Sequence, residues 1–160
     1  MAEHSLLVLE LLRREYGITS PAAQLAALLH DAHEAYTGDL STPCKRAVGY
    51  QWLDFESGWE RLVLNRFGVL RAAREYASLI KSCDLMALAC ERTALLPPPG
   101  AGNKPWAVLE GVQQPAWVNL SAGHHAAYIW ADWRDVYLEQ FAELFYAVHG
   151  DTQPNTTEAA

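Results

Sequence analysis

Segments with apolar residues at helical spacing, each closed by glycine or proline, constrain this chain more than any other feature. Leucine and alanine dominate several of these segments, and both residues favour helices. No stretch alternates apolar and polar residues as a half-buried strand does, and no internal repeat is evident. We therefore predict an all-α bundle of about five helices, in a single domain over residues 1–149 followed by a polar tail at 150–160.

Residues with clear conformational preferences mark where the expected helices begin and end. Gly17 ends the first, and Ser20-Pro21 opens the second with an N-cap and a proline at the first helical position. Gly68 separates the third from the fourth, and the prolines from Pro97 onward end the fourth. The predicted helices are 4–16, 22–35, 50–67, 70–95 and 128–148, with a loop at 37–43 and an ordered loop covering the core at 97–126.

The charge of the chain restricts its partners. The net charge is −7 and the sequence pI is near 5.3. A general nucleic-acid binder needs a basic face that displaces counterions from phosphates, so we expect no nucleic-acid polymer as a partner. An acidic protein still binds a small anion where a metal and a few local cations supply positive charge.

Cysteine usage and hydropathy indicate the compartment. Cys44, Cys83 and Cys90 show no CxxC or metal-ribbon spacing, which predicts three small hydrophobic core side chains in a reducing environment. No apolar stretch approaches the roughly 18 residues of a membrane span. The chain does not begin with a basic region followed by an apolar run. We expect a cytoplasmic protein without a membrane partner.

The chemistry-bearing residues gather between Leu28 and Asp39, in the run LLHDAHEAYTGD. In a continuous helix, Glu34 would lie one turn from both His30 and Asp31. A charge beside buried leucines is costly unless it is paired or bound to metal. One imidazole nitrogen and one carboxylate oxygen suit Mn, Fe, Co, Ni or Zn, but two protein ligands are too few for a site.

Two further candidate ligands lie on the flanking helices. His4 lies at the start of the first helix, and Asp84 lies among apolar residues of the fourth. Together with His30 and Asp31 they would form a two-His, two-Asp set that leaves room for water. Alone, His4 could be a surface or capping residue, and Asp84 could pair with Lys81 three residues earlier.

The remaining polar residues also have ordinary interpretations. Glu34 could be a solvated helix-end carboxylate, Asp39 a turn residue, and Lys45 a solvated cation. His33 is more simply explained as a local hydrogen-bonding residue. The histidine pair at 124–125 could approach a site, but a surface loop explains it more simply. A purely structural helical protein would need Asp84 and His30 to be satisfied without metal.

The order His … His-Asp … Asp resembles the signature of HD-domain phosphohydrolases. The fuller match is to the short nucleotidase branch, the bacterial 5'-deoxynucleotidases and the phage deoxynucleoside triphosphohydrolases. An HD dipeptide alone is not specific, whereas the HDxxExxxGD run with its upstream EHS and downstream KxxD is. The matching blocks are Ala2-Glu3-His4-Ser5, the run from His30 to Lys45, and Ile80-Lys81-Ser82-Cys83-Asp84, and they span residues 2 to 92.

The resemblance implies a helical bundle with one divalent transition metal on His4, His30, Asp31 and Asp84. It implies that Glu34 and Asp39 handle the attacking water and its protons, and that Lys45 and Lys81 lie near the substrate phosphate. The expected activity is removal of phosphate from deoxynucleoside 5'-monophosphates. Two alternatives stay open: hydrolysis of a deoxynucleoside triphosphate to nucleoside and triphosphate, and a degenerate module that binds nucleotide or metal without turnover.

The resemblance also implies a homo-oligomer, with which six Trp and seven Tyr are compatible. Relatives in this branch carry a further helix before the residue that matches His4, including an Arg and an aromatic residue that help hold the nucleotide. This chain begins three residues before His4. We therefore expect another segment or subunit to supply those contacts, unless the N-terminus is truncated.

Overall fold

Helices and the loops between them make up residues 2–96 and 105–150, which are the residues that this computed structural model describes. The all-α prediction is confirmed for these ranges. The expected count of about five helices was wrong, because two expected helices are broken and two expected loops contain additional short helices. The described elements are α1 Ala2–Tyr16, α2 Pro21–Leu28, α3 Glu34–Thr37, α4 Thr42–Val48, α5 Tyr50–Arg66, α6 Leu70–Glu75, α7 Ala77–Leu95, the 3-10 helix η1 Ala107–Leu109, α8 His124–Ala127 and α9 Trp130–His149.

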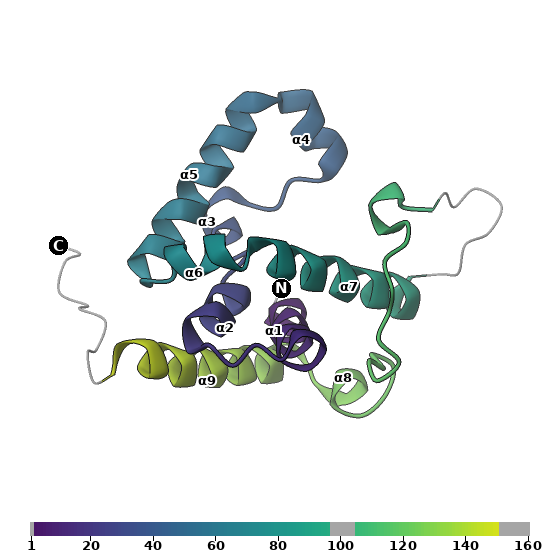
Figure 1. Ribbon diagram of the computed structural model, residues 1–160. Coiled ribbons are helices and arrows are strands. Elements are labelled where there is room, and N and C mark those ends of the chain that lie inside the picture. Colours follow the sequence, from purple (N-terminus) through teal and green to yellow (C-terminus); the bar gives the residue numbers. More distant parts are fainter. Residues whose placement is uncertain (1, 97–104, 151–160) are drawn as a thin grey trace.

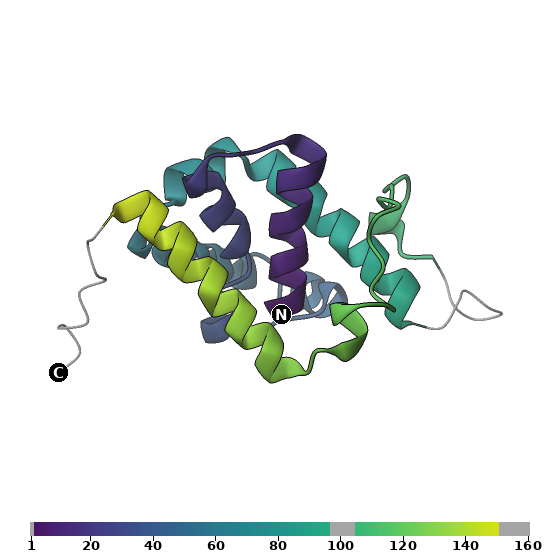
Figure 2. The same cartoon turned by 90° about the horizontal axis from the view of Figure 1, so that it is seen from below.

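The first helix lies at the centre of the bundle. It packs against α2, α7 and α9, which surround it in both views of the molecule (Figures 1 and 2). A helix covered on several sides must be apolar around most of its circumference. This packing carries His4, on the first turn of α1, into the middle of the bundle. The core residues of α1 are each at most 2% exposed: Leu7, Val8, Leu9, Leu11 and Leu12.

The expected boundaries of several helices are confirmed. Gly17 closes α1 with a φ of +62°, a conformation that glycine adopts without strain. Ser20 caps α2 by accepting a hydrogen bond from the Ala23 N–H at 3.4 Å, and Pro21 is the first helical residue. α5 and α9 match the predicted helices 50–67 and 128–148 to within two residues.

The predicted helix 22–35 is not continuous. α2 ends at Leu28, and the next residues form turns in which an N–H donates to the carbonyl three residues earlier. Glu34 N–H donates to Asp31 O in this way at 2.9 Å, immediately before α3 begins. The sequence prediction therefore erred in extending α-helical geometry through the His30-Asp31 pair.

Side chains contact two of the carbonyls that the end of α2 leaves free. The His30 ring contacts Ala27 O through Nδ1 at 2.9 Å. The Tyr137 hydroxyl of α9 donates to Leu28 O at 3.3 Å, and its burial raises the Tyr137 pKa to about 12. The end of α2 is thus held against α9 by this contact as well as by packing.

The other departures have a similar origin in packing. The predicted helix 70–95 breaks at Tyr76, so that α6 packs against α2 while α7 packs against α1. The predicted loop at 37–43 ends earlier than expected, because α4 begins at Thr42. In the predicted loop 97–126, the described part contains η1 and the start of α8; residues 97–104 lie outside the described residues.

The described part of that loop covers the core, as expected. Trp117 and Val118 pack against the core, and Leu120 is 5% exposed. Trp117 Nε1 donates to Glu15 Oε1 at 2.7 Å, and the Arg14 guanidinium lies 4.5 Å from the centre of the Trp117 ring. These contacts tie the loop to the end of α1.

The cysteine prediction is correct for two of the three residues. Cys83 and Cys90 are buried, while Cys44 is exposed because it lies on α4, at the outside of the molecule (Figure 1). All three thiols are free. None of the helices within 2–96 and 105–150 is long and apolar enough to cross a bilayer. The predicted polar tail lies outside the described residues beyond Gly150.

Candidate metal centre and adjoining cavity

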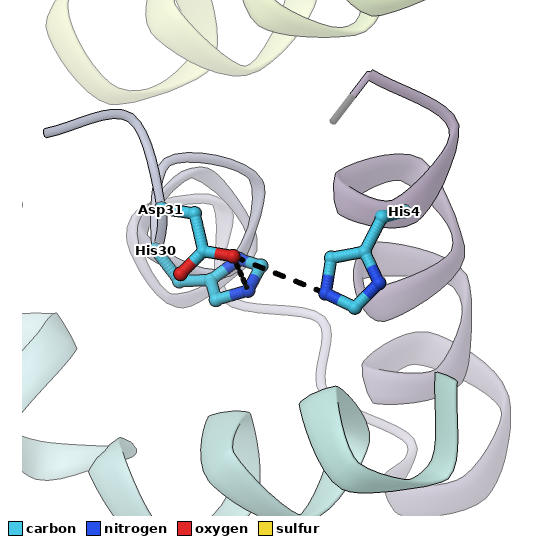
Figure 3. Close-up of side chains that lie close together, drawn as sticks. All are labelled: His4, His30 and Asp31. Atoms are coloured by element: carbon cyan, nitrogen blue, oxygen red, sulfur yellow. Dashed lines mark ion pairs between the residues drawn. The ribbon is translucent and has the colours of Figure 1, made fainter. Parts of the chain in front are cut away.

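Three predicted ligands, supplied by two separate parts of the chain, meet in the middle of the bundle. Figure 3 shows His4 projecting from α1 toward His30 and Asp31, which follow the end of α2. Asp31 Oδ2 lies 3.1 Å from His30 Nε2 and 4.0 Å from His4 Nε2. One donor atom from each residue lies within 4.8 Å of the other two, an arrangement that could hold a metal ion.

The fourth predicted ligand, Asp84, joins this group through His4. Asp84 Oδ1 lies 3.3 Å from His4 Nε2, while its Oδ2 accepts a hydrogen bond from Lys81 Nζ at 2.6 Å. The ordinary interpretation of Asp84 as an ion-pair partner of Lys81 is therefore correct, and its role as a metal ligand stays a prediction. The two roles are compatible because they use different oxygens of one carboxylate.

The orientation of both imidazole rings is fixed by an acceptor that contacts Nδ1 of each ring. His4 Nδ1 lies 3.0 and 3.1 Å from the two carboxylate oxygens of Glu91, so Nδ1–H donates to Glu91 and Nε2 faces the other ligands. In the same way, His30 Nδ1 contacts Ala27 O, which leaves Nε2 of that ring directed at Asp31. Such partners behind a histidine set its tautomer and raise its basicity as a metal ligand.

Glu91 is a site residue that the sequence analysis missed. It lies seven residues after Asp84 on α7, close to two helical turns, so both project from the same face. That spacing was the one indication in the sequence that Glu91 could lie near Asp84. It becomes informative only once α7 is known to pack against α1 at the level of His4, which is a fact of the tertiary structure.

The donor atoms fit a small divalent cation. His30 Nε2 is buried and makes no hydrogen bond within the described chain, although Asp31 Oδ2 is 3.1 Å away. Ligands at roughly 2.0–2.2 Å from a metal lie about 3 Å from their nearest neighbours and farther apart across the ion. The spacings of 3.1, 3.3 and 4.0 Å correspond to such a set. Two imidazoles and two carboxylates suit Mn, Fe, Co, Ni or Zn.

The electrostatics of the cluster favour a positive charge at its centre. Burial lowers the His4 pKa, but hydrogen bonds to Asp84 and Glu91 outweigh it and raise the pKa to about 10. Burial raises the Asp84 pKa, yet the hydrogen bonds from His4 and Lys81 hold it well below its usual range. Burial likewise raises the Asp31 pKa, but the adjacent His30 ring lowers it more. A proton on His4 Nε2 and a metal ion would therefore compete for the same position between His4, Asp31 and Asp84.

A cavity of about 580 Å³ adjoins the cluster. Its volume lies within the range of roughly 300–1,000 Å³ typical of small-molecule sites. Asp39 does not line the cavity; it is exposed, and it acts on Glu34 and Lys45 through its charge. The predicted site residues that line the cavity are His30, Asp31, Glu34, Lys45, Lys81 and Asp84.

The environment of the cavity shifts the pKa values of Glu34 and Lys45 for different reasons. Burial, and then the negative charges of Asp31 and Asp39, raise the Glu34 pKa to about 7. A carboxyl group that titrates near neutral pH can both accept and donate a proton. Burial lowers the Lys45 pKa, but the hydrogen bond to Glu56 raises it more. Lys45 Nζ and Glu56 Oε1 are 2.7 Å apart.

One face of α5 forms a wall of the cavity that the sequence analysis did not identify. The spacing of its lining residues is helical: Leu53, Asp54, Glu56, Ser57, Glu60 and Leu64. His33, which is 8% exposed, approaches this wall with Nε2 4.0 Å from Glu56 Oε1. The wall was missed because a charged helical face is normally solvated, and only the contacts of α5 with α3 and α4 place it beside the predicted site residues.

The second histidine pair lies on the other side of α1. His125 is partly buried, and its Nδ1 lies 2.8 Å from the carboxylate of Glu3, the residue before His4. His124 is exposed, as expected of a surface loop. The loop interpretation is therefore correct for His124 but incomplete for His125.

Comparisons with known proteins assign no activity. No protein-family model matches the chain, and no solved structure matches it. An uncharacterised protein of Rhodobacter capsulatus is 44% identical over 69 residues, which cover 43% of this chain and 35% of that protein. The uncharacterised protein YfdR of Escherichia coli K12 is 29% identical over 147 residues, which cover 90% of this chain and 70% of YfdR. The match thus spans little more than a third of the Rhodobacter protein.

Proposed function

We propose that this chain is a metal-dependent phosphohydrolase of the HD-domain kind that removes phosphate from deoxynucleoside 5'-monophosphates. The observation that carries the proposal is the buried His30 Nε2, which lacks a hydrogen-bond partner within the described chain. It faces Asp31 beside a cavity large enough for a nucleotide. A buried polar atom without a partner is costly, and a metal ion would satisfy it.

The residues around the cavity have distinct roles in this proposal. His4, His30, Asp31 and Asp84 hold one divalent ion, which supplies positive charge for the phosphoryl group and promotes ionisation of water near neutral pH. Glu34, with its pKa near 7, takes the proton of the attacking water. Lys45 and Lys81 line the same cavity; we assign Lys81 to the phosphoryl oxygens, and Lys45 only where its pairing with Glu56 is released. Asp39 supports the raised pKa of Glu34 through its charge.

The charge of the cavity wall favours a monophosphate over a triphosphate. Six carboxylates and two lysines line the cavity. A divalent ion offsets only part of this negative charge, so each additional phosphate group would add repulsion. The restriction to deoxynucleotides rests on the HD-domain resemblance alone. The acidic residues of the lining are Asp31, Glu34, Asp54, Glu56, Glu60 and Asp84.

The first test is phosphate and triphosphate release from a panel of deoxynucleoside mono- and triphosphates. The purified protein is assayed with added Mn, Co or Zn, with no added metal, and with chelator. We expect orthophosphate from monophosphates, abolished by chelator. Triphosphate release would assign the chain to the alternative enzyme, and no turnover with any metal would contradict both enzymatic proposals.

Glu34→Gln separates an enzyme from a module that only binds. The amide keeps the size of the side chain but cannot take a proton, so turnover should fall by about a hundredfold or more. Metal content, measured by elemental analysis, should stay unchanged because Glu34 is not among the proposed ligands. Unaltered turnover in this variant would remove the catalytic role assigned to Glu34.

A further inference from the structure

Glu56 is an inward-facing carboxylate whose position is fixed by two other elements. Its side chain is 15% exposed and lies on the cavity face of α5. Lys45 of α4 donates to it at 2.7 Å, and His33, from the turn before α3, lies 4.0 Å away. Both partners are themselves largely covered, with side-chain exposures of 28% and 10%. Glu56 thus joins three segments at one side of the cavity.

The two lysines of the cavity differ in what holds them. Lys81 is paired with Asp84, which also contacts His4, so Lys81 is tied to the metal centre. Lys45 is paired with Glu56, whose partners in the described chain are Lys45 and His33. A single phosphate group at the metal centre would therefore meet Lys81. Further phosphate groups would need a second cation, and Lys45 is the other lysine of the lining.

We propose that Glu56 is a specificity-determining residue that limits the number of phosphate groups the cavity accepts, by neutralising Lys45. The proposal rests on the proposed function, because it takes the cavity to be the phosphate site. Its physical basis is competition: a charge-assisted pair at 2.7 Å must be broken or shared before Lys45 can bind a phosphate oxygen. Removing the Glu56 charge frees Lys45 and lowers the repulsion felt by a polyanion.

Three inorganic probes test this without requiring turnover. Orthophosphate, pyrophosphate and tripolyphosphate are titrated into the full chain loaded with Mn, by calorimetry, for the parent protein and for Glu56→Gln. We expect tripolyphosphate affinity to rise by about fivefold in Glu56→Gln, which corresponds to about 1 kcal/mol. Orthophosphate affinity should change less, because Lys81 and the metal hold the first phosphate group.

Two further variants distinguish release of Lys45 from a general change in charge. Glu60→Gln removes the same charge from the same face of α5, but Glu60 is not among the groups that shift the Lys45 pKa. Its effect on tripolyphosphate affinity should be the smaller one. The double variant Glu56→Gln/Lys45→Gln should lose the gain. Equal effects of Glu56→Gln and Glu60→Gln, or a gain that survives loss of Lys45, would overturn the role of Glu56.

The outcomes separate this inference from the function on which it rests. Phosphate binding with no effect of Glu56→Gln refutes the role of Glu56 and leaves the phosphohydrolase proposal standing. The expected gain together with no hydrolysis of any nucleotide refutes the enzyme and keeps the role of Glu56 in anion selection. Binding of none of the three probes by any variant that retains the parent circular-dichroism spectrum refutes both.

Discussion

The contact between His4 and Glu91 fixes the orientation of the His4 ring. Glu91 binds Nδ1 of the ring and so leaves Nε2 directed at Asp31 and Asp84. Without that carboxylate the ring could rotate or carry its proton on the other nitrogen. Glu91 therefore belongs to the site although it is not one of the four proposed ligands.

Replacing Glu91 should weaken metal binding without removing a ligand. We expect Glu91→Gln to lower the affinity for Mn or Co by roughly 10- to 100-fold, the usual cost of losing a partner behind a ligating histidine. Competition with a chromophoric chelator measures this directly. Glu75→Gln, on the exposed surface of α6, is the control and should bind as the parent does. Equal affinities in both variants would show that Glu91 does not orient His4.

The raised pKa of His4 makes the stability of the metal-free protein depend on pH. The pKa rises from 6.5 to about 10 on folding, because the hydrogen bonds to Asp84 and Glu91 outweigh burial. The stability that the bound proton contributes is fully present below pH 6.5 and is lost as the pH rises through about 10. Urea denaturation in the presence of chelator should follow this decline, and His4→Gln should flatten it. A chelated parent protein that gains stability over this range would contradict the prediction.

Among the helices, the break after α2 matters most for the site. Consecutive residues of an α-helix point about 100° apart, so they do not share a face. The turns at residues 29–33 place His30 Nε2 and Asp31 Oδ2 within 3.1 Å of each other instead. The end of the helix thus lets these two adjacent side chains approach each other.

The turn between α5 and α6 depends on Gly68. Its φ is +69°, and a Cβ there would lie 2.7 Å from Cε1 of His149, whose ring contacts Phe67 O at 2.9 Å. Gly68→Ala should therefore lower the free energy of unfolding by more than about 1 kcal/mol. Gly58→Ala is the matched control: Gly58 lies within α5 with open space around it, so the change should stabilise by about 0.5–1 kcal/mol. Urea denaturation decides, and the two variants should shift the midpoint in opposite directions.

The bundle assembles the candidate metal centre from residues far apart in the chain. The proposed ligands come from α1, from the turn after α2 and from α7. An unfolded chain cannot hold four such groups in place, so a metal would bind the folded state almost exclusively. Metal binding and folding stability are therefore linked.

Added metal should raise the stability of the whole protein. At a free metal concentration a hundredfold above Kd, the gain is about 2.7 kcal/mol. Thermal unfolding of the chelated protein, before and after addition of Mn, Co or Zn, measures it as an increase in Tm. His30→Gln should abolish the increase. An increase of the same size in that variant would place the metal elsewhere.

Local sequence determined much of this protein by itself. The Ser20-Pro21 start of α2 and the glycine stop of α1 were predictable, because capping and left-handed φ are properties of a few adjacent residues. The sequence also singled out His4, His30, Asp31 and Asp84 as one set. The structure brings His4, His30 and Asp31 into one group, with Asp84 Oδ1 3.3 Å from His4 Nε2.

Only the tertiary structure decided the rest. Leu28 O, at the end of α2, accepts a hydrogen bond from Tyr137, which is 109 residues away in the chain. The roles of Glu91 and Glu56 follow from the packing of α7 on α1 and of α5 on α3 and α4. On sequence evidence both carboxylates are ordinary polar positions of amphipathic helices. The reason is physical: periodicity describes one helix face at a time, whereas a site is defined by which faces meet.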